Sequence, residues 1–265
     1  MNMFFHELKA YRKSTIIWTC SLIALVVLFL SLFPAFSKEA EAFKEIMKGF
    51  PEPLRKAFGF SVDSMSSILG FYSYMFLYTT LCGAIQAMNL GTSIVSKEVR
   101  QKTADFLLTR PVTRRAIMTS KLMAALTCLV ITNIIYLLVA SIMASFVATE
   151  KYSYKMFFMV SITLFFVQLM FLALGIIISV LIPKIKSVLP ISLGIVFAFF
   201  ILGMFAATTG DDAMRYITPF KYFDTTYILN NSSYEVQFFI IGLGFIVAAI
   251  TASYFVYSKK DVHSA

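Results

Sequence analysis

Charged residues, histidines and cysteines are scarce in this chain of 265 residues. Lys, Arg, Asp and Glu together make up 14% of the sequence, whereas 59% is hydrophobic and the mean hydropathy is +0.80. A soluble domain of this size needs a more polar surface. The 28 Phe exclude a disordered chain, and three Cys are too few for a disulfide scaffold. The composition therefore predicts a membrane protein.

Sequence signatures of catalysis and nucleotide binding are also missing. The chain contains no G-x-x-x-x-G-K-[ST] phosphate loop. Its two histidines, His6 and His263, lie near opposite ends, so no paired-histidine metal site can be built within the chain. Asp211 and Asp212 have no third metal ligand nearby and are interpreted as part of an external turn. We therefore expect a non-catalytic chain that itself binds no cofactor or metal ion.

Apolar runs, in contrast, are long and frequent. Crossing a bilayer as a helix takes about 20 residues, and a helix also satisfies every backbone hydrogen bond within the lipid. Six runs meet this requirement: 15–33, 67–95, 118–148, 154–182, 188–209 and 236–257. The predicted fold is an all-α polytopic membrane protein of six transmembrane helices, with residues 1–265 forming a single transmembrane domain.

The charges divide unevenly between the two sides of these spans. Fourteen Lys/Arg and four Asp/Glu lie on the side that includes both termini, and nine and ten lie on the other. Basic loops stay in the cytoplasm, so both termini are predicted to be cytoplasmic. The net charge of +9 then reflects topology and attraction to membrane lipids. Nucleic-acid binding is not expected, because the chain has no basic-aromatic platform.

Two segments outside the spans have patterns of their own. Residues 1–14 place Phe4, Leu8 and Tyr11 at helical spacing, which predicts an amphipathic helix lying at the membrane interface. Residues 34–66 form an external segment in which a short helix is expected to end at Gly49.

Polar and small residues within the spans predict contacts between helices. Four amide side chains lie at membrane depth: Gln86, Asn89, Asn133 and Gln168. They should face a partner helix, which is the commoner use, or line a wet translocation path. Two sets of small residues recur at i, i+4 and i+8: Gly83, Ala87 and Gly91, and Gly244, Ala248 and Ala252. Each set predicts a packing seam within the subunit or across a dimer. No Asp or Glu lies deep in a span, which argues against a proton-coupled carrier.

The stretch 96–117, after the second span, is dense in charge. Helical spacing of its less polar side chains appears at Val99, Thr103 and Phe106. This spacing predicts an amphipathic helix that Ser96 can cap and that the Arg110-Pro111 step ends, because proline lacks a backbone donor. Such a helix would suit a groove on a cytosolic partner, but an ordinary basic loop fits the residues equally well.

Between Glu98 and Lys121 the chain shows an acid, Arg, Lys-Thr, Phe-Leu-Leu-Thr, Pro-Val-Thr-Arg and Lys in that order, and Thr218–Phe223 reads TPFKYF. This order resembles the first cytoplasmic loop of ATP-binding-cassette (ABC) permeases of the ABC type-2 exporter class, which also commonly contain a Thr-Pro-Phe element. The resemblance implies that Val99–Leu108 is a coupling helix. The implied ATPase-coupling residues are Glu98, Val99, Arg100, Lys102, Thr103, Phe106, Leu107, Arg110, Pro111, Arg114 and Arg115.

The same resemblance implies partners and a location. The chain would be one permease of a homodimer, or of a pair with a sister permease, bound to two cytosolic ABC ATPase subunits that hold ATP and Mg. It would form the path of an ATP-driven exporter in a bacterial plasma membrane, with residues 210–235 folded back as short helices at the outer surface. The alternatives are a membrane sensor or scaffold that uses such an ATPase in peptide protection or regulation, and an independent secondary carrier.

Overall fold

The computed structural model describes residues 2–51, 54–55, 67–100, 113–182, 185–209 and 212–259, and within these ranges all regular structure is helical. The elements are α1 (Asn2–Lys38), α2 (Ala40–Lys48), α4 (Ile68–Arg100), α6 (Arg114–Val147), α7 (Tyr154–Leu181), α8 (Val188–Thr209), α9 (Asp212–Arg215), η1 (Pro219–Lys221), α10 (Thr225–Asn231) and α11 (Val236–Lys259). Six of them, α1, α4, α6, α7, α8 and α11, are long and apolar enough to span a membrane. The predicted all-α polytopic fold is thereby confirmed.

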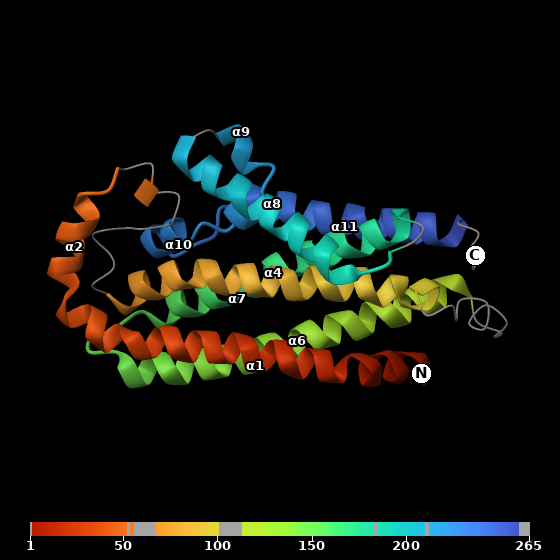
Figure 1. The fold of residues 1–265 in the computed structure, drawn as a ribbon, viewed down its shortest axis with the longest axis horizontal. Coiled ribbons are helices and arrows are strands. Elements are labelled where there is room, and N and C mark those ends of the chain that lie inside the picture. The colour runs from red at the N-terminus through yellow and green to blue at the C-terminus, as the bar shows by residue number, and fades with distance from the viewer. Residues whose placement is uncertain are drawn as a thin grey trace.

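The long helices run side by side in three tiers (Figure 1). α4 and α7 form the middle tier, with α1 and α6 on one side and α8 and α11 on the other. The two termini lie at the same end of the bundle, which we call the terminal end. The short helices α2, α9 and α10 lie toward the opposite end, which we call the distal end.

The middle tier is packed backbone against backbone. Gly83, Ala87 and Gly91 of α4 are buried against α7, and a Cβ added at Gly91 would collide with the carbonyl oxygen of Leu172. A Cβ at Gly175 of α7 would lie 2.7 Å from the carbonyl oxygen of Met88. Small residues therefore let α4 and α7 approach closely, and this seam lies within the subunit.

The other small-residue seam has a different environment. Gly244 and Ala248 of α11 are exposed, and a Cβ added at Gly244 would meet no described atom within 4 Å. In the apolar 18-residue stretch of each helix, only 17% is buried in α11 and 22% in α8, against 56% in α4 and 61% in α7. The face formed by α8 and α11 is therefore left for lipid or for another chain.

Two helix boundaries differ from the sequence-based prediction. The amphipathic stretch 1–14 is helical but is not separate from the first span, because α1 continues unbroken from Asn2 to Lys38 and its residues Phe4, Leu8 and Tyr11 pack against the core. Its position at the membrane interface stays a prediction. Ser96 caps no helix start, since α4 runs on to Arg100 and the Ser96 hydroxyl donates to the Thr92 carbonyl inside it. In both places tertiary contacts prolong the helix. The short helix expected before Gly49 is present as α2.

Candidate functional site

A buried ionic cluster at the terminal end joins three helices. The Glu7 carboxylate of α1 lies 3.3 Å from Lys97 Nζ of α4 and 3.6 Å from Lys121 Nζ of α6. The Glu7 side chain is only 3% exposed and that of Lys121 is completely buried. Lys121 Nζ also donates to the Ile94 carbonyl of α4. We call these three charged residues the Glu7 cluster.

Hydrogen bonds around the Glu7 cluster fix α1 to the end of α4. The Tyr11 hydroxyl lies 3.0 Å from Ser93 Oγ, and Arg100 donates to the same oxygen at 3.3 Å. Lys97 Nζ lies 5.8 Å from the centre of the Tyr11 ring, within reach of a cation–π interaction. The first turns of α1 are therefore held by α4 and α6 rather than by the membrane surface alone.

The two lysines of the Glu7 cluster flank the predicted coupling loop in the sequence. Lys97 is in the last turn of α4, before residues 101–112, and Lys121 is in the second full turn of α6, after them. Since one carboxylate contacts both lysines, the two helices that flank the loop share one buried anchor on α1. Any displacement of one helix end must strain this anchor or move α1 with it.

The predicted coupling residues are placed only in part. Arg100 ends α4 with an exposed side chain, while Arg114 and Arg115 begin α6, whose first turn is capped by Thr113 Oγ1 accepting from Ala116 N at 3.2 Å. Glu98 and Val99 belong to the last turn of α4 by their backbones. The remaining members lie outside the described residues: Lys102, Thr103, Phe106, Leu107, Arg110 and Pro111. Their role in coupling stays a prediction.

Three of the four amides predicted at membrane depth meet in one buried network. Gln168 of α7 donates to Gln86 of α4 at 3.0 Å, and Gln86 donates to Thr132 of α6 at 3.1 Å. Asn133 donates to the Gln168 carbonyl oxygen. Thr132 and Thr19 of α1 are 2.9 Å apart, so the chain of bonds crosses four helices.

This geometry matches interhelical hydrogen bonding, and a role in a translocation path stays a prediction. Asn89 is set apart: its side chain is partly exposed and has no hydrogen bond to any other described residue.

Residues 212–231 form a folded segment at the distal end. Arg215 pairs with Glu235, donates through Nε to the Lys221 carbonyl at 3.0 Å and stacks 4.0 Å from the centre of the Phe238 ring. Thr218 Oγ1 donates to the Phe199 carbonyl at 2.9 Å. These bonds attach α9 and η1 to α8 and to the start of α11, while α10 packs against α7 and α4.

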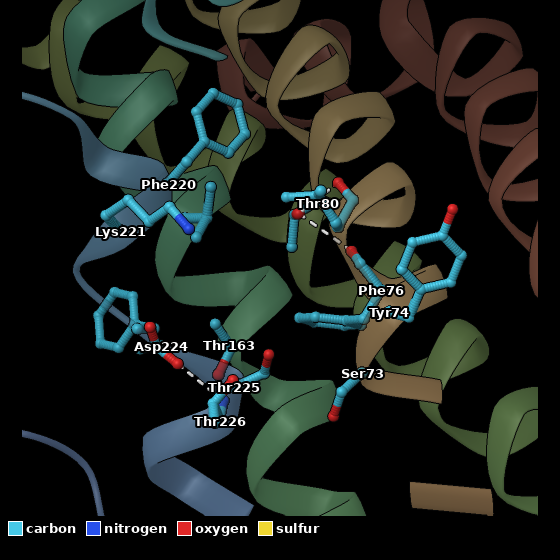
Figure 2. Close-up of a pocket in the computed structure, with 13 residues that line it drawn as sticks. Ser73, Tyr74, Phe76, Thr80, Thr163, Phe220, Lys221, Asp224, Thr225 and Thr226 are labelled. Carbon is cyan, nitrogen blue, oxygen red and sulfur yellow. Dashed lines mark hydrogen bonds between the residues drawn. The ribbon is translucent and has the colours of Figure 1, made fainter. Parts of the chain in front are cut away.

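A cavity of about 80 Å³ lies between this segment, α4 and α7. Its lining is Ser73, Tyr74, Phe76, Leu77, Thr80, Thr163, Val167, Phe220, Lys221, Phe223, Asp224, Thr225 and Thr226. Figure 2 shows these side chains arriving from three separate stretches of chain. Burial lowers the pKa of the Lys221 ammonium, with Arg215 acting in the same direction and Asp224 opposing both. We call this cavity the distal pocket.

Sequence reasoning missed both the Glu7 cluster and the distal pocket. One local signal for the cluster was available, since Lys121 is a lone charge inside an apolar stretch and such a residue needs a partner. Nothing local marks Ser73, and Lys221, although it belongs to the TPFKYF stretch, carries no local signal of a pocket. Among the described residues no group of three or more His, Cys, Asp or Glu side chains is arranged to hold a metal ion.

Comparison with known proteins gives the family. The family model for ABC-2 family transporter protein matches residues 1–262. No curated protein matches the chain. A match over almost the whole length, on a bundle of six membrane-spanning helices, agrees with the resemblance in the stretch from Glu98 to Lys121. The chain therefore belongs to the ABC-2 transporter family and is a multi-pass membrane component of a transport system.

Proposed function

We propose that this chain is the permease subunit of an ATP-driven ABC exporter, which forms the translocation path and is driven by a separate cytosolic ATPase. The chain has no phosphate loop of its own, so ATP and Mg would be bound by that partner. The observation that carries the proposal is the Glu7 cluster, in which one buried carboxylate ties together the two helices flanking residues 101–112.

The charge distribution supports an orientation for this assembly. The helix ends that flank the basic loops lie at the terminal end, so we propose that this end faces the cytoplasm and that the distal end, with α2 and α10, faces outward. The coupling loop is then on the side where ATP is available.

Coupling would follow from the stiffness of α4. A coupling helix at Val99–Leu108 that moves with nucleotide-driven closure of the ATPase pushes directly on α4, because α4 is helical up to Arg100. α4 is packed backbone to backbone on α7, so these two helices move together, and the Glu7 cluster passes the same displacement to α1 and α6. The spans would tilt as a group between inward-facing and outward-facing states.

The exposed face of α8 and α11 supports a second copy in the assembly. Its small residues Gly244 and Ala248 would let another helix approach closely. We propose a permease dimer, of two copies or of this chain with a sister permease, bound to two ATPase subunits.

A reconstitution experiment tests the proposal. The tagged full chain is purified from native membranes with its co-purifying ATPase, and ATP-dependent flux is measured in proteoliposomes for wild type, Phe106→Asp and the matched control Phe106→Leu. Phe106→Asp should insert normally yet lose ATP-driven flux, and Phe106→Leu should retain it, because only the carboxylate spoils an apolar docking face.

Three results would contradict this proposal. Full flux in Phe106→Asp excludes the coupling helix, and ATPase binding without flux of any compound indicates a sensor or scaffold. Flux without any ATPase indicates a secondary carrier.

A further inference from the structure

The distal pocket contains one ammonium and one carboxylate that are not paired with each other. Lys221 and Asp224 both line it, yet neither forms a salt bridge within the described part of the chain. In Figure 2 Lys221 extends from its loop into the space beside α7, with Asp224 below it. Two opposite charges that share a cavity without meeting leave both available to a ligand with two opposite charges of its own.

Each charge has unused capacity for hydrogen bonding. Asp224 Oδ1 accepts from Thr226 N at 2.7 Å and Tyr227 N at 3.2 Å, which caps α10, but a carboxylate has about four acceptor positions. The Lys221 ammonium has three donors and is largely withdrawn from water, which is why its pKa is lowered. Both groups therefore gain from a partner inside the pocket.

Other lining residues give the distal pocket a further hydrogen-bond donor and an apolar surface. Ser73 Oγ is buried and has no hydrogen-bond partner among the described residues, so its hydroxyl can donate to an anion. The rings of Phe76, Phe220 and Phe223, with Leu77 and Val167, form the apolar part of the lining. The other lining residues carry hydroxyl groups: Tyr74, Thr80, Thr163, Thr225 and Thr226. A ligand that fits must combine charged groups with hydrocarbon.

The depth of the distal pocket matches the level of lipid headgroups. α4 has 33 residues and is about 50 Å long, whereas the hydrocarbon core is about 30 Å thick. If α4 is centred, about 10 Å at each end lies outside the hydrocarbon. Ser73 lies about 8 Å and Thr80 about 18 Å from the start of α4, so the pocket straddles this boundary.

We propose that the distal pocket binds the zwitterionic headgroup of a lipid of the phosphatidylethanolamine type. Its phosphodiester, a monoanion, contacts the Lys221 ammonium and Ser73 Oγ, and its primary ammonium donates to the Asp224 carboxylate. The acyl chains leave along Leu77 and Val167. At about 10–15 Å³ for each water-sized group, the cavity of about 80 Å³ holds about five to eight such groups, which is the size range of a phosphoethanolamine group.

Charge also sets the lipid preference. A phosphatidylglycerol headgroup has the phosphate but no ammonium, so it leaves Asp224 unpaired in the pocket. A phosphatidylcholine headgroup has a cation with no N–H donor and three added methyl groups. Both should bind less tightly than phosphatidylethanolamine. This inference goes beyond transport and does not depend on the ATPase, because lipid binding is measured on the chain alone.

Native mass spectrometry of the purified full chain in detergent tests the inference, with the three lipids titrated separately. The wild type should bind phosphatidylethanolamine about tenfold more tightly than the other two lipids, a difference of about one charge pair. Lys221→Met should weaken phosphatidylethanolamine about tenfold. Asp224→Asn keeps the cap of α10, since Asn caps as well as Asp, but should shift the preference toward phosphatidylglycerol. The exposed Lys155, changed to Met, is the matched control and should leave binding unchanged.

Further binding measurements distinguish a lipid site from a headgroup site and test the lipid preference. Soluble glycerophosphoethanolamine has the same headgroup without the tails and should bind at least tenfold more weakly than the lipid; equal binding would overturn the lipid assignment. Equal affinity of the wild type for all three lipids, or a wild-type preference for phosphatidylglycerol, would overturn the zwitterion site. So would an unchanged preference in Asp224→Asn, provided that its circular dichroism and melting temperature match those of the wild type.

Discussion

Replacing Glu7 with Gln removes the one negative charge of a buried cluster whose other members are two lysines. The Lys121 side chain is fully buried and Lys97 is 16% exposed, so Lys97 can reach water but Lys121 cannot. Removing one member of a buried ion pair costs about 3–5 kcal/mol, because the remaining charge loses its partner without regaining water. With a shift of about 2–4 °C per kcal/mol, the melting temperature should fall by about 6–20 °C.

The assay is thermal unfolding of the purified full chain, followed by circular dichroism. The double variant Glu7→Gln/Lys121→Met also removes the buried ammonium that has lost its carboxylate and should melt above the single variant, which a double-mutant cycle quantifies. Glu45→Gln is the matched control, because Glu45 pairs with Lys48 at 2.9 Å with both side chains exposed, and it should melt like the wild type.

A Glu7→Gln variant that melts within about 2 °C of the wild type would contradict this prediction, because one lost buried pair should lower the melting temperature further. A double variant less stable than the single one would contradict it as well. In either case the Glu7 cluster would not be the anchor between α1 and the two helices that flank residues 101–112.

Three further predictions concern the core and the orientation. Gly91→Ala should lower the melting temperature by several degrees because its Cβ collides with α7, whereas Gly194→Ala, in open space, should not. Gln168→Leu should destabilise the chain by about 1–2 kcal/mol in a denaturation series, since Gln86 and Asn133 each lose a bond. In a background with the native cysteines replaced by serine, Lys48→Cys should react with an impermeant maleimide in intact cells and Lys259→Cys should not; the reverse pattern contradicts the proposed orientation.

The six spans and the short helix α2 were predictable because both depend on local pattern. A run of about 20 apolar residues spans the bilayer whatever surrounds it, and Gly49 ends a helix through its own backbone freedom. The charge bias that predicts cytoplasmic termini is likewise a property of each loop alone. The order of residues from Glu98 to Lys121 is also local, and it indicates the same family as the family model that matches the chain.

Tertiary packing decided what the same local patterns leave open. Gly83, Ala87 and Gly91 share their spacing with Gly244, Ala248 and Ala252, yet only the first set is buried within the subunit. An amphipathic stripe such as Phe4, Leu8 and Tyr11 fits a membrane surface or a neighbouring helix equally well, and here α4 supplies the neighbour.

The sequence by itself determined the class of protein and the number of spans, because hydrophobicity acts residue by residue; the sidedness that it predicts from charge stays a prediction. Only the tertiary structure brought Glu7 to Lys97 and Lys121, and Ser73 to Lys221 and Asp224. Those partners lie roughly 90 to 150 positions apart in the chain, and their contact depends on which of six helices of similar composition pack against one another. Packing of small against large side chains makes that choice, and no single segment specifies which helix will be its partner.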